Sequence, residues 1–432
     1  MKTQSNFVII GAGPKALAVV AKSYVLNHLF ALPMPTFHVI EKKEVGANWT
    51  GGNGFTNGNL RLGTSPQKDI GFPYNSKIFG NQNDARINRE MRAFSWDMYL
   101  INNGKYAEWI DRGRPSPTHF EWAQYLKYGF SILKDYVHIH TGYLKEIFYN
   151  EKIVRIDFDN NGVVKTLGAD YLMLTGPGES NFKKPIESTR IFDINSYWKS
   201  KIDFSQNEKI LIVGGGENSA TIVLDINQKF GNRNLDFNIV TPSGMIITRG
   251  ESYFENRVYT DANNGHWDYL TRDEKISFIK HTDLGVYSVE AMNDLSRSAN
   301  LNIIKGLVKG ASELNGKVIV TFQDGIKASN SYDRVILANG FQKVGLLSSK
   351  LNIHSKKELE CIIGKIVDKN LENKIGRDLS IKGIRKKIFL PMISGISQGP
   401  GFSNLSSLGT LSDRVLYSLI SVKNKELYNV SN

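Results

Sequence analysis

One short segment near the N-terminus constrains the fold more than any other part of the chain. Residues 7–18 read FVIIGAGPKALA: four apolar residues, a glycine-rich turn, then an alanine-rich segment. This order predicts a buried parallel strand, a tight turn and the start of a helix, which together bind a dinucleotide. Gly11 lets the turn close, Gly13 leaves room for a pyrophosphate, and the small Ala16 lets the helix pack on the strand.

The next predicted strand supports the same interpretation. The segment FHVIEKK supplies Glu41, an acid placed where such a unit binds ribose hydroxyls. Trp49 follows in EVGANWTGG and either lies against a flavin or is a core aromatic. The alternative for the whole segment is an ordinary glycine turn with a surface glutamate. The residues predicted to bind the first cofactor are Gly11, Gly13, Pro14, Lys15, Ala16, Glu41 and Trp49.

A second fingerprint, KILIVGGGENSA, occupies residues 209–220 and again joins an apolar strand to a helix. Two fingerprints predict two dinucleotides, because each requires its own strand, turn and helix. The following strand, LDFNIV, ends before Thr241 rather than at an acid, which favours NADPH and leaves NADH open. The residues predicted to bind this second cofactor are Gly214, Gly216, Glu217, Ser219, Thr241 and Ser243.

The pattern along the chain predicts an α/β protein with two Rossmann-like dinucleotide-binding domains, the second inserted in the first, plus a small substrate region. YLMLTGPG (171–178) and YDRVILANGF (332–341) are the strands expected to close the two halves. We therefore predict an FAD-binding domain at 1–185 and 335–432 and an NAD(P)H-binding domain at 186–334. A glycine- and serine-rich loop at 394–413 and a helix at 414–422 are expected to return the chain to the first domain.

Composition excludes several classes of function. The chain has 432 residues, with 54 Lys and Arg against 42 Asp and Glu, but these basic residues are scattered and predict no nucleic-acid binding. Its single cysteine excludes a cysteine zinc cluster, and no metal site is expected. No apolar run is long enough to span a membrane and no signal peptide is recognisable, so we expect a cytoplasmic protein.

Two groups of residues that other flavin enzymes need are missing from the sequence, and this limits the possible electron acceptors. A flavin disulfide reductase needs paired cysteines, and this chain has only Cys361. The FxGxxxHxxxW signature of class B monooxygenases corresponds to FDINSYW at 192–198, which lacks the glycine and the histidine. Neither of these classes accounts for the two nucleotide sites.

Several longer motifs carry a specific resemblance over almost the whole chain. They are GAGPKALA, GANW, RLGTSPQKDIGFPY, EWIDRGRPSPTHFEWAQYL, LTGPG, VGGGENSA, TRGESYFEN and LPMISGISQGPGFSNLSSLGTLSDRVL. In these motifs the chain resembles the lysine and ornithine N-hydroxylating flavin monooxygenases of siderophore biosynthesis, and most of all the mycobactin-type lysine N-hydroxylases.

The resemblance implies a reaction and roles for individual residues. NADPH reduces FAD, O₂ adds to give a C4a-hydroperoxyflavin, and a primary amine attacks its distal oxygen, with no side chain assigned as acid or base. Lys68 matches the lysine that holds the substrate carboxylate, and Asn256 matches an asparagine that contacts substrate. Leu411 matches a position near the flavin, and Ser412 one near the substrate amine. Relatives of this kind commonly form homo-oligomers.

At two positions the sequence differs from the ornithine enzymes, so more than one amine is possible as the substrate. Gly63 stands where they carry a glutamine, and Val286 stands where they carry an asparagine. Lysine, free or acylated, is the main expectation, and a carboxylate-free amine such as histamine or a diamine is the alternative. An NAD(P)H oxidase or a flavin redox sensor is a further alternative. The group that stabilises the hydroperoxyflavin is left unassigned.

Overall fold

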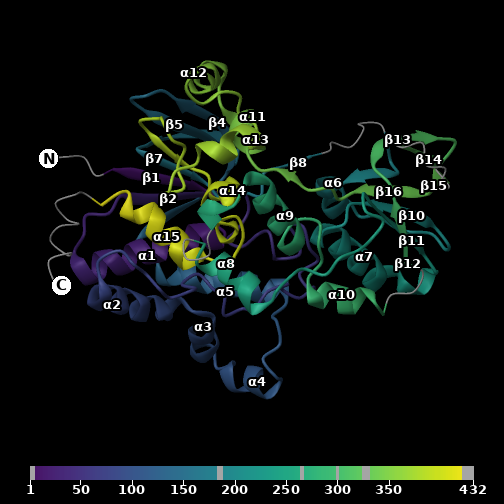
Figure 1. Ribbon diagram of the computed structural model, residues 1–432, viewed down its shortest axis with the longest axis horizontal. Helices are drawn as coiled ribbons and strands as arrows, with labels where there is room; N and C mark the ends of the chain where they lie inside the picture. The colour runs from purple at the N-terminus through teal and green to yellow at the C-terminus, as the bar shows by residue number, and fades with distance from the viewer. Residues whose placement is uncertain (1–4, 182–187, 263–266, 298–300, 324–330, 421–432) are drawn as a thin grey trace.

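The computed structural model describes residues 5–181, 188–262, 267–297, 301–323 and 331–420. Figure 1 shows two α/β units side by side, one containing the N-terminal strand and the other the second glycine fingerprint. A narrow connection near residues 180 and 341 joins them. This arrangement confirms the predicted α/β class with two Rossmann-like units, the second inserted in the first.

The first unit is organised around a five-stranded parallel sheet. Its strands are β1 (Asn6–Ile10), β2 (Thr36–Glu41), β3 (Val137–Thr141), β7 (Tyr171–Leu174) and β18 (Lys387–Phe389). They lie in the order β18-β7-β1-β2-β3, which puts β1 at the centre. Because successive side chains of a strand point to opposite faces, Phe7 and Ile9 contribute to one core and Val8 and Ile10 to another.

Different layers cover the two faces of the first sheet. Helices α1 (Pro14–Phe30), α5 (His119–Ile132) and α15 (Leu408–Tyr417) share a core with Phe7 and Ile9. A three-stranded antiparallel sheet covers the opposite face. Its strands are β4 (Tyr143–Tyr149), β5 (Val154–Asn160) and β6 (Val163–Ala169).

The second unit repeats this plan. Its parallel sheet has the order β12-β11-β10-β16-β9, and a small antiparallel sheet, β13-β14-β15, packs on one of its faces. The parallel strands are β9 (Ile191–Asp193), β10 (Lys209–Val213), β11 (Asp236–Thr241), β12 (Leu301–Lys305) and β16 (Arg334–Leu337). The antiparallel strands are β13 (Val308–Leu314), β14 (Lys317–Phe322) and β15 (Ser331–Tyr332).

The connection between the units is a two-stranded antiparallel sheet of β8 (Glu179–Ser180) and β17 (Phe341–Gln342). Strand β16 pairs with β10, so a domain boundary at 334/335 would cut a strand of the second sheet. We therefore propose that this boundary lies between β16 and β17, a few residues later than expected. The expected boundary at 185/186 falls outside the described residues.

The remaining helices fill the crossovers and the C-terminal region. They are α2 (Asn81–Met91), α3 (Trp96–Asn102), α4 (Tyr106–Asp111), α6 (Ile194–Lys199), α7 (Glu217–Phe230), α8 (Tyr253–Thr260), α9 (Arg272–Thr282), α10 (Val289–Leu295), α11 (Gly345–Lys350), α12 (Ile353–Ile363), α13 (Asp368–Leu371) and α14 (Gly395–Gln398). Short 3-10 turns lie at Arg92–Phe94, Gly231–Arg233, Trp267–Tyr269, Glu372–Lys374, Pro391–Ile393 and Pro400–Phe402.

The C-terminal region differs from the sequence expectation. The predicted loop at 394–413 contains α14 and the first half of α15, which begins at Leu408 rather than at residue 414. Leu408, Leu411 and Val415 are buried at helical spacing and pack in the core with α1. The serines and glycines of this segment obscured that apolar stripe.

Two features are absent from the described part of the chain. No helix there is both long and apolar enough to cross a membrane. No cluster of three or more His, Cys, Asp or Glu side chains among these residues has an arrangement that could hold a metal ion.

Candidate functional site

The first glycine turn forms a cradle that only a side chain as small as hydrogen fits. Gly11 has a φ of 101°, and a Cβ there would lie 2.4 Å from Thr175 Oγ1. Gly13 is the N-cap of α1 and has no side-chain capping bond, so the first turn of the helix offers free backbone N–H groups. This cradle suits the pyrophosphate of a dinucleotide.

The other predicted residues of the first cofactor site lie around this turn. Glu41 accepts a hydrogen bond from the Ala12 N–H at 2.9 Å, so its carboxylate also braces the turn. The Trp49 ring lies 4.0 Å from the position a Cβ on Gly13 would take, close enough to cover a bound pyrophosphate. Lys15 points elsewhere: its ammonium donates to the Ser403 carbonyl at 3.1 Å, and burial lowers its pKa to about 8. Lys15 therefore ties α1 to the C-terminal region.

Gly11→Ala should weaken flavin binding. The added methyl group would meet Thr175, and alanine is strained at this φ, so we expect an FAD affinity about tenfold lower. The ratio of flavin absorbance to protein absorbance after purification, followed by FAD titration, measures this. Gly168→Ala is the matched control, because a Cβ at Gly168 meets nothing within 4 Å. Equal flavin content in both variants would contradict the assignment.

The second glycine turn has the same geometry. Gly214 has a φ of 134°, and Gly216 is the N-cap of α7, again without a side-chain cap. Ser219 is fully buried and its hydroxyl donates to the Gly216 carbonyl at 2.6 Å, so it shapes the turn. Glu217 accepts hydrogen bonds from the backbone N–H and the hydroxyl of Ser288 at 2.7 and 2.8 Å. Ser288 is the N-cap residue of α10.

A cavity of about 220 Å³ lies where the two units meet. Five parts of the chain line it: the loop before α2 (62–64 and Lys68), the start of α7, the segment from 249 into α8, the end of α9, and the C-terminal loop at 404–406. His119 at the start of α5 also lines it, and burial lowers the pKa of His119 to about 4, so this imidazole is neutral.

Lys68 and Asn256 meet in this cavity although they are far apart in sequence. The Lys68 ammonium donates to Asn256 Oδ1 at 2.6 Å, and Asn256 Nδ2 donates to the Glu251 carbonyl at 2.8 Å. Burial lowers the pKa of Lys68, although the nearby Glu251 carboxylate opposes this effect. The pair presents a cation and an amide to a ligand, an arrangement suited to a carboxylate.

The loop that carries Lys68 is held by its neighbour, Asp69. This buried carboxylate accepts hydrogen bonds from the Gly71 N–H at 3.1 Å, the Tyr74 hydroxyl at 2.8 Å and the Trp96 N–H at 2.9 Å. Burial is the main cause of a pKa for Asp69 raised to about 7. Asp69 thus fixes the backbone next to Lys68, a role that the sequence did not indicate.

The raised pKa of Asp69 predicts a pH-dependent stability. The folded protein binds this proton more tightly than the unfolded chain, so the stabilisation is full below pH 4 and is lost as the pH rises through 7. Relative to Asp69→Asn, the free energy of unfolding should fall by about 2–3 kcal/mol between pH 5 and pH 8. Urea denaturation of both proteins across this range measures it. Parallel stability curves would contradict the shift.

Three carboxylates also line the cavity, and only Glu217 was among the residues predicted from the sequence, as part of the second cofactor site. Glu217 is bonded to Ser288, and Glu251 is paired with Arg249, whose guanidinium also donates to the Gly63 carbonyl. The third is Asp283. Burial raises its pKa, while the positive charge of Lys343 and a bond from Asn404 Nδ2 at 3.4 Å oppose this effect. Asp283 directly follows α9 and lies in none of the motifs quoted from the sequence.

Two predicted residues are not brought into the cavity. Leu411 and Ser412 are fully buried in α15, and the Ser412 hydroxyl donates to the Gly409 carbonyl at 2.8 Å. Ser412 therefore lies outside the lining of this cavity, and its place near the substrate amine stays a prediction. The C-terminal region reaches the cavity through residues 404–406 instead. The physical reason is that α15 already begins at Leu408, so Leu411 and Ser412 lie on a helix that packs against α1.

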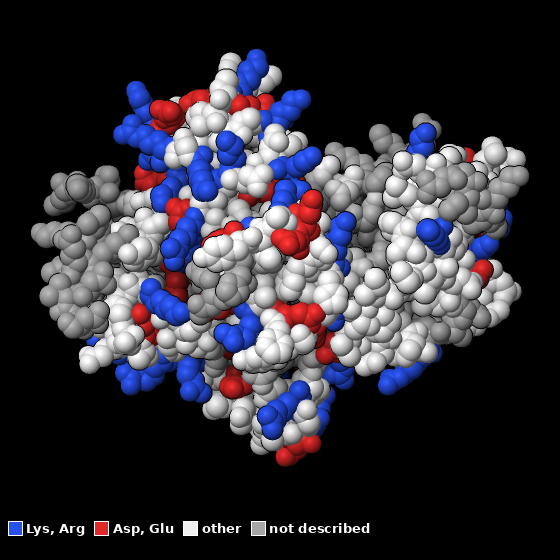
Figure 2. Space-filling model, viewed as in Figure 1, with Lys and Arg blue, Asp and Glu red and all other residues white. Residues whose placement is uncertain are grey.

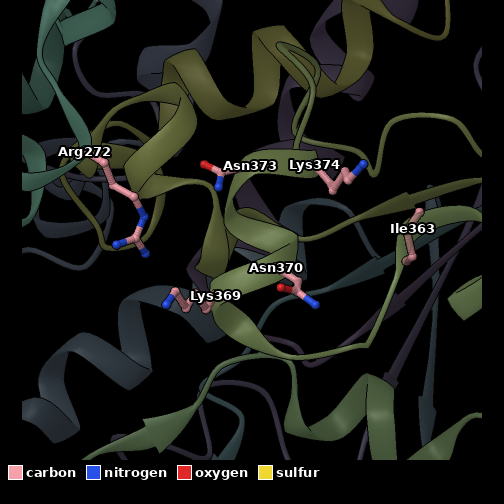
Figure 3. Close-up of a pocket in the computed structure, with 6 residues that line it drawn as sticks. All are labelled: Arg272, Ile363, Lys369, Asn370, Asn373 and Lys374. Carbon is pink, nitrogen blue, oxygen red and sulfur yellow. The ribbon is translucent and has the colours of Figure 1, made fainter.

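A second hollow is larger, about 670 Å³, but does not resemble a site. Figure 3 shows its six lining residues around the end of α12, α13 and the start of α9. Five of them are exposed, and Arg272 is bonded to Glu372 at 2.7 Å. No predicted site residue lies there, so volume alone does not identify the functional site.

Two dinucleotide cradles, one in each unit, with a cavity between the units that the start of α7 lines, define a flavin- and pyridine-nucleotide-dependent oxidoreductase. The family model for L-lysine 6-monooxygenase/L-ornithine 5-monooxygenase matches residues 89–343. The chain belongs to this family of flavin-dependent monooxygenases, which confirms the predicted resemblance, enzyme class and cofactor class.

Individual proteins to which the chain is similar are also lysine or ornithine monooxygenases. The chain is 35% identical to the L-lysine N6-monooxygenase MbtG of Mycobacterium tuberculosis over 95% of this chain and 94% of that protein. Lysine monooxygenase NbtG from Nocardia farcinica is similar in structure, with a TM-score of 0.81, 34% identity, and coverage of 95% of this chain and 98% of that one. The ornithine N-hydroxylase KtzI of Kutzneria sp. 744 has a TM-score of 0.73, coverage of 96% and 99%, and 17% identity, so it supports the fold alone.

Proposed function

We propose that this chain N-hydroxylates the side-chain amine of L-lysine, with FAD, NADPH and O₂, in siderophore biosynthesis. The observation that carries the proposal is the cavity between the two units, in which the Lys68 ammonium and the Asn256 side chain meet. The names of the relatives that cover nearly the whole chain support lysine as the substrate.

In this proposal, separate groups of residues bind FAD, NADPH and the substrate. The first glycine turn, Glu41 and Trp49 hold FAD, and the second turn holds NADPH. The bound cofactors supply the hydride and the activation of O₂. Lys68 and Asn256 hold the carboxylate of the substrate, and this contact orients its amine inside the cavity.

The cavity must also favour a neutral amine, because only the neutral form is a nucleophile. A free alkylamine has a pKa near about 10.4, and removal from water lowers it. Burial lowers the pKa of Lys68, which lines this cavity, so the surroundings already disfavour an ammonium group. Glu251 is paired with Arg249 and Glu217 accepts two hydrogen bonds from Ser288, but the Glu251 carboxylate still partly opposes this effect at Lys68.

The test is a coupled assay with four amines. NADPH consumption, hydroxylamine product and H₂O₂ are measured with L-lysine, L-ornithine, cadaverine and histamine. We expect hydroxylamine from L-lysine with kcat/KM at least about tenfold above that for any other amine. Equal activity with cadaverine would show that the carboxylate is not recognised. NADPH consumption that is indifferent to all four amines and yields only H₂O₂ would show an oxidase instead.

Location and assembly remain proposals as well. We propose a cytoplasmic enzyme that forms a homo-oligomer and binds no nucleic acid. Its single cysteine, Cys361, is exposed and unpaired, which suits a reducing compartment. On the face shown in Figure 2, basic side chains are mixed with acidic and neutral ones and form no continuous stripe. Sedimentation of the purified protein tests the assembly, and cell fractionation tests the location.

A further inference from the structure

The carboxyl ends of β11 and β12 form a small polar corner beside the second glycine turn. The two strands are parallel and in register, with Thr241 paired to Lys305. The Thr241 methyl lies 2.9 Å from the position a Cβ on Gly215 would take, which places this corner against the glycine turn. In a Rossmann unit, the adenosine ribose of the dinucleotide lies over the end of this second strand.

The loop after β11 folds back so that two side chains are left exposed. Gly244 N–H donates to Thr241 Oγ1 at 3.0 Å, and Met245 N–H donates to Ser243 Oγ at 3.2 Å. A Cβ on Gly244 would lie 2.7 Å from the Lys305 Cβ, so the loop packs on the base of that side chain. The Ser243 and Lys305 side chains are exposed at this corner.

The charge at this corner is positive and uncompensated by an ion pair. Thr241 occupies the place where an NAD-specific unit carries an acid, which would bind the ribose 2′-hydroxyl and repel a 2′-phosphate. None of the ion pairs formed between described residues includes Lys305. A hydroxyl and an ammonium group on neighbouring segments of one corner are a suitable pair of donors for a phosphate monoester.

We propose that Lys305, assisted by the Ser243 hydroxyl, binds the 2′-phosphate of NADP(H) and sets the preference of this enzyme for NADPH over NADH. The inference rests on the proposed use of the second cradle for a pyridine nucleotide. Lys305 enters the site from β12, a strand that no glycine fingerprint marks. Between Thr241 and Arg249 the sequence contains no arginine, and Arg249 is turned into the cavity toward Gly63 and Glu251.

Direct binding measurements test this without reference to turnover. The flavin-loaded protein is titrated with NADP⁺, NAD⁺, 2′,5′-ADP and 5′-ADP by calorimetry. For Lys305→Ala we expect the Kd of NADP⁺ and of 2′,5′-ADP to rise by about 30-fold, with NAD⁺ and 5′-ADP within about twofold of the wild type. Lys305→Arg keeps the charge and should stay within about threefold for all four ligands.

The control is Lys309→Ala, which removes an exposed lysine from the neighbouring strand β13. It should leave all four Kd values unchanged. The inference is wrong if Lys305→Ala keeps the wild-type ratio of NADP⁺ to NAD⁺ affinity, or if Lys309→Ala changes that ratio as much. If the wild-type protein binds none of the four ligands, the proposed function itself fails, which is a distinguishable result.

Discussion

Lys68→Ala should raise the KM for L-lysine by about 100-fold, because a charged partner of the substrate carboxylate is lost. The structure places the Lys68 ammonium in the cavity at 2.6 Å from Asn256 Oδ1, so the substrate carboxylate would meet both side chains. We expect a smaller fall in kcat, because the residue binds the end of the substrate remote from the reacting amine. Steady-state kinetics with varied L-lysine at saturating NADPH measures both constants.

Cadaverine separates this contact from a general disturbance of the cavity. It carries the same amine as lysine but no carboxylate, so Lys68→Ala should change its KM by less than about threefold. Lys77→Ala, which removes an exposed lysine from the same loop region, should leave both substrates unaffected. An equal rise in KM for L-lysine and cadaverine would contradict carboxylate recognition by Lys68.

Asp413→Ala should lower the free energy of unfolding by about 3–5 kcal/mol, because it leaves the buried Lys22 ammonium group without its counter-charge. Lys22 is 1% exposed, and its Nζ lies 2.6 Å from Asp413 Oδ1. The Ser76 hydroxyl donates to the same oxygen at 2.8 Å. This cluster joins α1, the loop before α2 and α15, so its loss should loosen all three. Urea denaturation measures the change.

The size of this effect depends on burial and not on the ion pair as such. Lys22→Met combined with Asp413→Leu removes both charges and should recover stability to within about 2 kcal/mol of the wild type. Glu108→Ala breaks the exposed pair with Arg112 and should cost less than about 0.5 kcal/mol. A single variant Asp413→Ala as stable as Glu108→Ala would show that Lys22 reaches water.

The fold was predictable from local patterns to a large extent. Each glycine fingerprint constrains its own strand, turn and helix, and both turns have the predicted geometry at Gly11 and Gly214. The C-terminal helix was misplaced by six residues at its start, because serine and glycine between Leu408, Leu411 and Val415 masked the apolar periodicity. We propose a later domain boundary than 334/335 because β16 belongs to the second sheet.

The site was less accessible to prediction from sequence. Motif resemblance singled out Lys68 and Asn256, and the structure brings them into one cavity. Asp69 lies in the same motif as Lys68 but was assigned no role, and Asp283 lies in no quoted motif; their importance comes from burial and from partners such as Trp96 and Lys343 that lie elsewhere in the chain. Ser412 has the right motif but lies in the core.

By itself, the sequence determined the elements whose chemistry is local: two strand–glycine–helix cradles, the absence of paired cysteines and the family motifs. Only the tertiary structure decided which of the remaining polar residues share a site. Lys305 lies beside Thr241 because parallel strands end at one edge of a sheet, and Lys68 meets Asn256 because two units dock. Such contacts join residues far apart along the chain, so no local pattern encodes them.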